Sequence, residues 1–294
     1  MLQENCQSSQ HFRLTYSMTA YIINFVPKFI PKTVQQKGGI NIQPANSENM
    51  GHPSLPDGVC IHRAGELPQD GLLTVCQQLS VNESRLLYIG LQALAMQLRQ
   101  GQWQEIRIPT ASIVTLFGGN KGYYDQLKKI AAKLVKKKIV LKGKHCSLFD
   151  HIRFNPSGGG LFIMFNIDIK DMLQELFCKQ GMQITVKEVF EFKSRYTVRL
   201  LELFSRYMAR QDVQAAGRLR LAVSIDDLKR LLGIPMTKTY EQITNIRHKI
   251  LNIAVEEINH STSCSVCYNA IKEGARVKAF LFDVTLSRSD SLGA

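Results

Sequence analysis

The side chains with the greatest capacity for chemistry are basic and amide groups concentrated in two stretches of the chain. From Gly118 to Arg153, nine lysines and Arg153 stand against Asp125 and Asp150, a local net charge of +8. Residues 238–259 instead mix Lys, Arg and His with Gln and Asn. Side chains of these kinds bond phosphates and base edges, so both stretches indicate contact with nucleic acid.

Twenty side chains are candidates for contact with double-stranded DNA. In the second stretch and the predicted hairpin after it they are Lys238, Thr239, Glu241, Gln242, Asn245, Arg247, His248, Lys249, Lys272, Arg276 and Lys278. In the first stretch they are Lys121, Lys128, Lys129, Lys133, Lys136, Lys137, Lys138, Lys142 and Lys144. The lysines of the first stretch surround their helix without a pattern, which suits phosphate contact. We therefore expect the second stretch to carry more of the specificity, and the first to supply nonspecific affinity or an interface.

A helix is predicted over residues 238–259, and on a wheel of 100° per residue its apolar and polar side chains separate. The apolar side holds Ile243, Ile246, Ile250, Leu251, Ile253, Ala254 and Ile258, and the opposite side Lys238, Glu241, Gln242, Asn245, His248, Lys249 and Asn252. A helix in a major groove needs this division, although any surface helix is polar outside. Arg247 lies near the apolar side: either its stem packs while its head reaches DNA, or it pairs with Asp226 or Asp227.

Composition also favours a polyanionic partner. The 294 residues include 37 Lys and Arg against 24 Asp and Glu, a formal net charge of +13. Residues 1–80 hold five basic and five acidic side chains, so the whole excess lies in 81–294. A field of this size attracts nucleic acid. The apolar stretch 21–30 is too short for a membrane span and no secretory leader is recognisable, so a cytoplasmic protein without a membrane partner is expected.

Motifs for catalysis and for metal binding are missing from the sequence. Of the seven cysteines only Cys264 and Cys267 form a CxxC pair, and no second ligand pair lies nearby, so we expect reduced thiols in a strand. The sequence has no His-hydrophobic-His pair, no phosphate-binding glycine loop and no paired-carboxylate site. We therefore expect no metal, no cofactor and no enzymatic activity.

The elements that position the two stretches follow one order that occurs twice. Residues 32–72 are rich in Gly, Pro, Gln, Asn and Ser, so 1–80 are expected to be a poorly ordered N-terminal extension. The first copy has a helix from Asn82 to Gly101 capped by Ser80 or Asn82, a strand at 105–108, helices at 109–117 and 121–138, and extended segments at 138–144 and 161–167 joined by a loop containing glycines 158–160.

The second copy begins about 110 residues later. It has a helix at 191–208, a strand at 220–223, a helix at 225–232 capped by Ser224 and ended by Gly233, the helix at 238–259, and strands at 264–268 and 276–282. Helix, strand, helix, turn, helix and hairpin is the order of a winged helix. We predict an α+β, mainly helical fold with tandem winged-helix domains at 81–184 and 185–285, and a C-terminal tail at 286–294.

Four motifs of the second half carry a resemblance to a known family. They are FKSRYTVRLLEL at 192–203, SIDDLKRLLGIP at 224–235, Tyr240 with ILNIAVEEIN at 250–259, and YNAIKEGAR at 268–276. The chain resembles the Rep replication initiators of iteron-containing bacterial plasmids over roughly residues 82–284. The match is strong in the second half and lies at the level of pattern in the first.

The resemblance implies monomers that bind direct repeats, the iterons, at a plasmid origin and start DNA replication. It also implies a homodimer in equilibrium with the monomer that represses the initiator's own gene at an operator inverted repeat, with host replication proteins as further partners. Arg247, His248 and Lys249 match the family's basic positions, whereas Glu241 stands where a base is common. Two alternatives stay open: a winged-helix transcriptional regulator without a replication role, and a first basic helix that chiefly binds protein or RNA.

Overall fold

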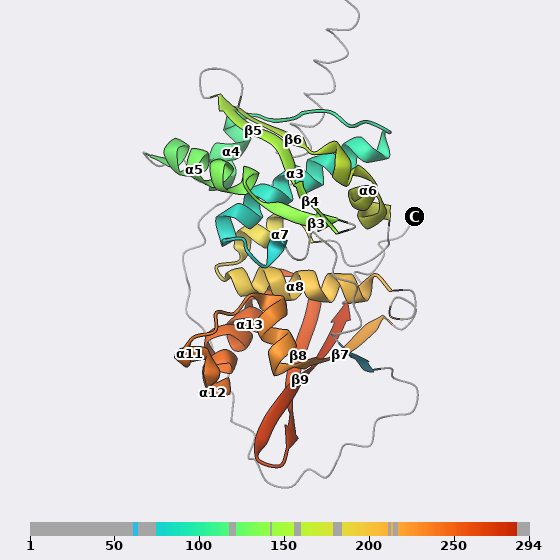
Figure 1. Ribbon diagram of the computed structural model, residues 1–294, viewed down its shortest axis with the longest axis vertical. Helices are drawn as coiled ribbons and strands as arrows, with labels where there is room; N and C mark the ends of the chain where they lie inside the picture. Colours follow the sequence, from blue (N-terminus) through green and yellow to red (C-terminus); the bar gives the residue numbers. More distant parts are fainter. Residues whose placement is uncertain are drawn as a thin grey trace, which may run out of the picture.

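The computed structural model describes residues 61–63, 75–117, 122–141, 143–155, 160–178, 184–210, 213 and 217–286. Lys121 and Lys142, two of the lysines predicted to contact DNA, lie outside these residues, as do most of the predicted N-terminal extension and nearly all of the predicted tail. The described residues form two domains stacked end to end, the first above the second in Figure 1.

The first domain places its helices and short strands in the order expected of a winged helix. Its elements are α3 (Val81–Arg99), β2 (Ile106–Ile108), α4 (Thr110–Phe117), α5 (Tyr123–Val135), β3 (Lys138–Leu141), β4 (Lys144–Ser147), β5 (Phe149–Asn155), β6 (Gly160–Phe165), the 3-10 turn η2 (Ile167–Ile169) and α6 (Lys170–Cys178). Ser80 caps α3 through a capping box with Glu83, which confirms one of the two predicted caps. Leu86, Leu87 and Leu94 lie in the core that α3 shares with the sheet.

The pairing of the extended segments in the first domain differs from the prediction. Segments 138–144 and 161–167 were expected to form one hairpin, and this is wrong. β3 pairs with β4 in a separate two-stranded ribbon, while β6 pairs with β5 and β2 in the order β2-β6-β5. Gly143 has a φ of +77°, which lets the chain reverse within the short link between β3 and β4. The local pairing of β3 with β4 therefore replaces the predicted pairing of segment 138–144 with segment 161–167.

The second domain repeats the order with longer wing strands. Its elements are α7 (Val186–Glu191), α8 (Arg195–Met208), β7 (Arg218–Ser224), α10 (Ile225–Leu232), α11 (Lys238–Glu241), α12 (Ile243–Ile246), the π-turn η3 (Arg247–Leu251), α13 (Asn252–Ser261), β8 (Cys264–Glu273) and β9 (Arg276–Leu286). Ser224 caps α10 by accepting from the Asp227 amide at 3.0 Å, as predicted. The predicted single helix at 238–259 is divided into α11, α12, η3 and α13.

A strand from the predicted extension completes the sheet of the second domain. β1 (Ile61–Arg63) runs parallel to β7, with Ile61 opposite Arg220, and the sheet order is β1-β7-β9-β8. The expectation of little order therefore does not hold for residues 61–63. Cys264 and Cys267 both lie on β8 as predicted, the first buried and the second exposed. Burial raises the pKa of the Cys264 thiol to about 11, so it stays protonated at neutral pH.

Residues 75–79, which we name the strap, lead into α3 and lie against the end of α10. Val75, Cys76 and Leu79 are buried there. Gly233 ends α10 with a φ of +58°, and a Cβ at this position would lie 2.7 Å from the Gln77 carbonyl oxygen. The strap therefore runs so close to the end of α10 that only glycine fits. Among the described helices, none is long and apolar enough to cross a membrane.

We predict that Gly233→Ala lowers the free energy of unfolding by on the order of 1–3 kcal/mol, because alanine is strained at a positive φ. The close Gln77 carbonyl adds to this loss. Gly217→Ala is the matched control, since Gly217 has a φ of +63° and nothing within 4 Å of the added Cβ. Urea denaturation of both variants separates backbone strain from crowding. Equal losses at the two positions would show that the strap does not press on Gly233.

Candidate nucleic-acid interface

Residues 238–261, which we name the recognition segment, present eight of the twenty predicted DNA contacts on one open surface. Lys238, Thr239, Glu241, Gln242, Arg247, His248 and Lys249 are exposed, while Asn245 is half-buried. The segment lies beside the β8–β9 hairpin, on the outer edge of the second domain (Figure 1). The structure therefore brings these predicted contacts together on one element, with a wing beside them.

The π-turn explains how this segment keeps one buried face. Ile246, Ile250, Ala254 and Ile258 are all fully buried at intervals of four residues. In a regular α-helix that interval drifts by about 40° per step, so the last side chain would point about 120° away from the first. A π-turn adds about one residue to a turn and takes up most of this drift. The buried line stays straight because η3 lies within it.

Two positions on the predicted wheel change as a result. Ile253 was placed on the apolar side, and this is wrong, because its side chain is 41% exposed. Arg247 was placed near the apolar side and is also exposed. Among the described residues Arg247 pairs with neither Asp226 nor Asp227, and Asp227 accepts from Arg230 at 2.7 Å and from Ser224 at 2.8 Å. The Arg247 side chain therefore extends from the outer surface of the recognition segment.

Asn245 has an internal role that the sequence did not reveal. Its amide nitrogen donates to the Thr239 carbonyl at 2.8 Å and to the Gln242 side-chain oxygen at 3.1 Å. These bonds close the bend between α11 and α12, where Gln242 leaves the helical conformation. Asn245 thus holds Thr239 and Gln242 in place, and its side-chain oxygen, which makes no hydrogen bond with a described residue, can accept one from DNA.

The recognition segment is fastened to the wing through Asn252. The Tyr268 hydroxyl on β8 donates to the Asn252 side-chain oxygen, and the Asn252 amide lies 3.5 Å from Nδ1 of His248. The Tyr268 ring packs at 5.5 Å from Phe280 and 5.8 Å from Phe282 on β9. His248 is therefore held on the outer face by a connection that reaches the core of the sheet.

The β8–β9 hairpin carries the remaining basic candidates of the second domain. Lys272 and Arg276 are exposed on either side of the turn, where Gly274 has a φ of +61°. Lys278 forms an ion pair with Glu273 at 3.2 Å, but both side chains are exposed, so the pair contributes little stability. An incoming phosphate can displace such a contact at small cost.

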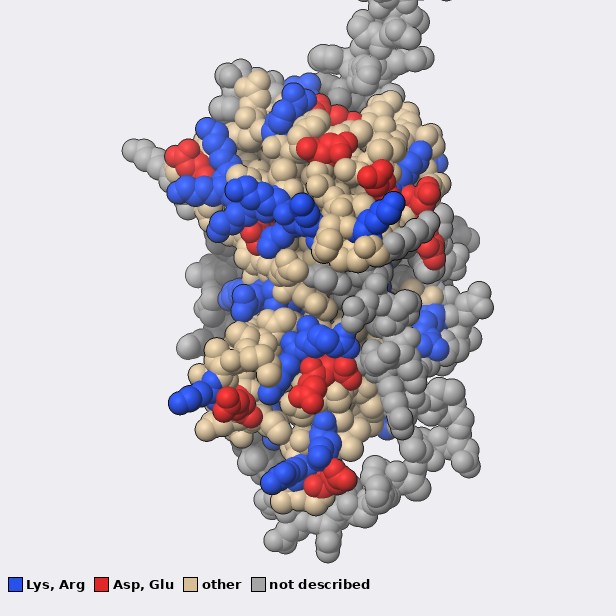
Figure 2. Space-filling view, in the orientation of Figure 1, with Lys and Arg blue, Asp and Glu red and all other residues tan. Residues whose placement is uncertain are grey.

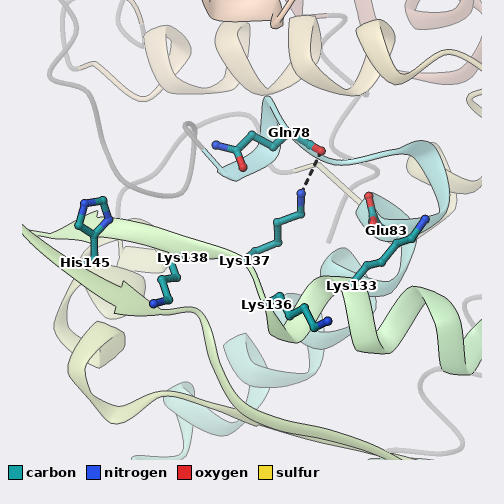
Figure 3. Close-up of a pocket in the computed structure, with 7 residues that line it drawn as sticks. All are labelled: Gln78, Glu83, Lys133, Lys136, Lys137, Lys138 and His145. Atoms are coloured by element: carbon teal, nitrogen blue, oxygen red, sulfur yellow. Dashed lines mark hydrogen bonds between the residues drawn. The ribbon is translucent and has the colours of Figure 1, made fainter.

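The first domain carries a denser basic surface. Figure 2 shows Lys and Arg side chains gathering over α5 and the strands after it. Lys133, Lys136, Lys137 and Lys138, together with Gln78, Glu83 and His145, line a hollow of about 500 Å³ next to the strap (Figure 3). Lys137 donates to the Gln78 carbonyl at 3.4 Å. The carboxylate of Glu83 already accepts from the Ser80 amide at 2.7 Å, so it offsets the lysines only in part.

The other end of α5 presents aromatic side chains that are not among the predicted DNA contacts. The Tyr124 ring is 36% exposed and lies 5.1 Å from Phe154 on β5, while Tyr123 behind it is buried. Arg153, exposed on the same strand, donates to the Glu105 carboxylate at 2.5 Å. In the sequence, the two tyrosines at the start of a lysine-rich helix could have indicated an aromatic contact with DNA. Only the position of β5 in the sheet, however, places Phe154 beside them.

Titratable groups give no sign of a metal centre in the part of the chain that the structure describes. In that part, no group of three or more His, Cys, Asp and Glu side chains is arranged to hold an ion. The Glu105 carboxylate contacts His151 and Arg153, and hydrogen bonds from these two side chains outweigh partial burial and lower its pKa. Glu105 is therefore a charged anchor for β5 of the first domain.

Two family models match the chain. One is described as "Initiator Replication protein, WH1" and matches residues 69–205; the other is described as "Initiator Rep protein, WH2" and matches residues 224–284. A comparison with curated protein sequences gave no significant match.

Solved structures with a similar fold include the Pi initiator protein in complex with iteron DNA. That structure has 21% sequence identity and a TM-score of 0.60, and the match covers 74% of this chain and 95% of that chain. Domains 2 and 3 of RctB match at 9% identity and a TM-score of 0.44, over 71% of this chain and 83% of that chain.

We predict that replacing Lys136, Lys137 and Lys138 by Ala weakens binding to any duplex. Losing three phosphate contacts should flatten the dependence of log K on log salt by about 2–3. Fluorescence anisotropy with a random-sequence duplex over a salt series measures both. The control replaces Lys170, Lys187 and Lys193, which removes equal charge away from α5. Equal changes in slope for the two variants would contradict a localised grip on phosphates at α5.

Proposed function

The chain belongs to the initiator Rep protein family, whose two winged-helix domains it carries in order, and from this membership we propose that it binds iterons at a plasmid origin and starts DNA replication there. The observation that carries the proposal is the recognition segment: a buried line of four apolar side chains on one face and exposed Arg, His, Lys and Gln side chains on the other. Such side chains bond base edges in a major groove.

The two domains divide the work of binding. The recognition segment offers few, well-placed polar groups, and its wing adds Lys272 and Arg276 for the backbone. The first domain offers a dense lysine surface, which attracts phosphates without regard to sequence. We infer that the second domain selects the repeat and that the first domain adds most of the affinity. The fold shared with the Pi initiator, whose structure contains iteron DNA, supports the binding of such repeats by a pair of domains of this kind.

The regulatory part of the proposal concerns the oligomeric state. A direct repeat presents its copies head to tail and suits monomers, whereas an inverted repeat has two-fold symmetry and suits a homodimer. We propose that monomers bind iterons, that a homodimer in equilibrium with them represses the chain's own gene at an operator inverted repeat, and that host replication proteins join at the origin. Family membership favours this function over that of a transcriptional regulator without a replication role.

The proposal needs no catalytic step by this chain. Binding and distorting duplex DNA requires neither a metal nor a cofactor, and we propose that the protein acts without enzymatic activity of its own. Its site of action follows from its DNA partner: a bacterial plasmid in the cytoplasm.

The function is tested by binding and by replication together. Duplexes that tile the DNA flanking the coding sequence are assayed for binding with the full chain, and the preferred fragment is placed on a plasmid without another origin. We expect preference for a fragment with direct repeats, and plasmid maintenance only when the protein is supplied. Equal binding to all fragments would overturn the proposal. Preference for repeats without plasmid maintenance would favour the regulator.

We predict that Arg247→Ala reduces discrimination between the repeat and a scrambled duplex by roughly 1–3 kcal/mol, because a base-edge contact is lost. Binding to the scrambled duplex should change little. Arg99→Ala is the control, since Arg99 is an exposed arginine in the last turn of α3, far from the recognition segment. If Arg247→Ala weakens repeat and scrambled duplex equally, Arg247 contacts phosphate and does not read sequence.

A further inference from the structure

A buried arginine joins the two domains. Arg199 lies on α8 and only 3% of its surface is exposed. The hydrogen bonds that its guanidinium makes with described residues all go to main-chain carbonyls: Cys76 at 3.3 Å, Leu79 at 2.9 Å and Leu232 at 2.5 Å. Two of these carbonyls belong to the strap and the third to the end of α10. One charged group therefore holds the strap against the second domain.

The position of the strap relative to Arg199 is constrained because burying a charged group without its hydrogen bonds is energetically unfavourable. Burial, assisted by nearby Arg195, lowers the pKa of Arg199 to about 10, so the group is still protonated at neutral pH. A buried cation without its hydrogen bonds costs far more than an ordinary lost contact, so any movement of the strap away from α8 is opposed. Gly233, with no room for a Cβ beside Gln77, lets the strap approach this closely.

Two further polar contacts tie α3 to the second domain. The buried Tyr88 hydroxyl donates to the Glu202 carboxylate on α8, which also accepts from Arg206 at 2.8 Å. Arg85 donates to the carbonyls of Phe190 at 2.9 Å and Phe192 at 3.0 Å. Hydrogen bonds to charged groups depend on direction as well as distance, so these contacts fix the rotation of one domain on the other.

Both DNA-contacting helices are fixed to this junction. α5 and the recognition segment lie on the same side of the molecule, one in each domain (Figure 1). α5 packs on α3, which the strap leads into, and α13 packs on α8, which carries Arg199. The separation of the two DNA-contacting surfaces is therefore determined by how the strap and α3 are held on α8.

We propose that Arg199 is a specificity-determining residue: by holding the two domains at one distance and rotation, it limits the length of DNA site that both domains can contact together. The inference rests on the proposed function. Each inserted base pair moves one half of a site by about 3.4 Å and rotates it by about 34° relative to the other half. A rigid pair of domains cannot follow this change, whereas a pair joined only by a flexible connection can.

The experiment compares spacings within the site. The probe is the preferred repeat fragment from the flanking DNA, in which footprinting locates the parts protected by each domain; one, two or five base pairs are then inserted between them. The measured quantity is the ratio of Kd for each insertion to Kd for the native spacing. For the wild type, five base pairs, half a helical turn, should raise Kd by at least tenfold.

In Arg199→Met the side chain keeps much of its bulk and loses all its donors, so the strap is released. We expect the penalty for inserting five base pairs, the ratio of the two Kd values, to fall at least threefold below the wild-type value, while binding at native spacing weakens. Tyr88→Phe, which keeps Arg199, should reduce the penalty in the same direction by less. Arg99→Met, an exposed arginine on α3, should keep the wild-type ratio. Partial unfolding lowers the active fraction for every probe alike, so it does not change the ratio.

The outcomes separate the two proposals. If the wild type binds no repeat in preference to other DNA, the proposed function and this inference are both overturned. If the wild type binds the repeat and Arg199→Met keeps the full insertion penalty, this inference alone is overturned. A lower penalty in Arg199→Met and Tyr88→Phe, with the control unchanged, supports the role of Arg199.

Discussion

The docking of both domains on α8 is the constraint on which the arrangement of the molecule depends. One face of this helix supplies Leu200, Leu203, Phe204 and Tyr207 to the core of the second domain. The other side turns Arg199 and Glu202 toward the strap and α3, where both are buried. An apolar interface of the same size would adhere in several orientations, whereas buried charges with fixed partners tolerate few. The polar side of α8 thereby gives the two domains a defined relation.

A second constraint acts within the recognition segment. A helix that reads DNA must keep one face in the core and leave the other free, and in a regular α-helix the row formed by Ile246, Ile250, Ala254 and Ile258 would turn by about 40° at each step. The π-turn at 247–251 reconciles this spacing with one buried line. Three adjacent basic outward positions, Arg247, His248 and Lys249, occur within that turn. The backbone feature that solves the packing problem also sets where these side chains point.

Much of the fold could be predicted from the sequence because its signals are local. Ser80 with Glu83 and Ser224 with Asp227 mark helix starts, and Gly233 marks an end, as found. The pairing of the strands at 138–144 and 161–167 could not be predicted, since a tight reversal at Gly143 competes with a distant partner and composition does not rank the two. Similarly, Arg199 and Glu202 have the spacing of a solvated helix face, and only the docked first domain makes them buried. Ile253 was misplaced because a regular wheel contains no π-turn.

The two DNA-contacting surfaces differ in kind, and rigid docking determines what they achieve together. Lysines around the hollow near α5 attract any phosphate, so alone they hold the protein on all DNA equally. The recognition segment distinguishes bases but has few groups with which to hold the backbone. Linking two binding modules raises the effective concentration of the second once the first has bound, and a stiff link does so only when the sites have the matching separation. The nonspecific surface therefore adds affinity chiefly where the recognition segment has bound its sequence. In this way the lysine surface near α5, which does not distinguish sequences, increases the selectivity of the whole protein.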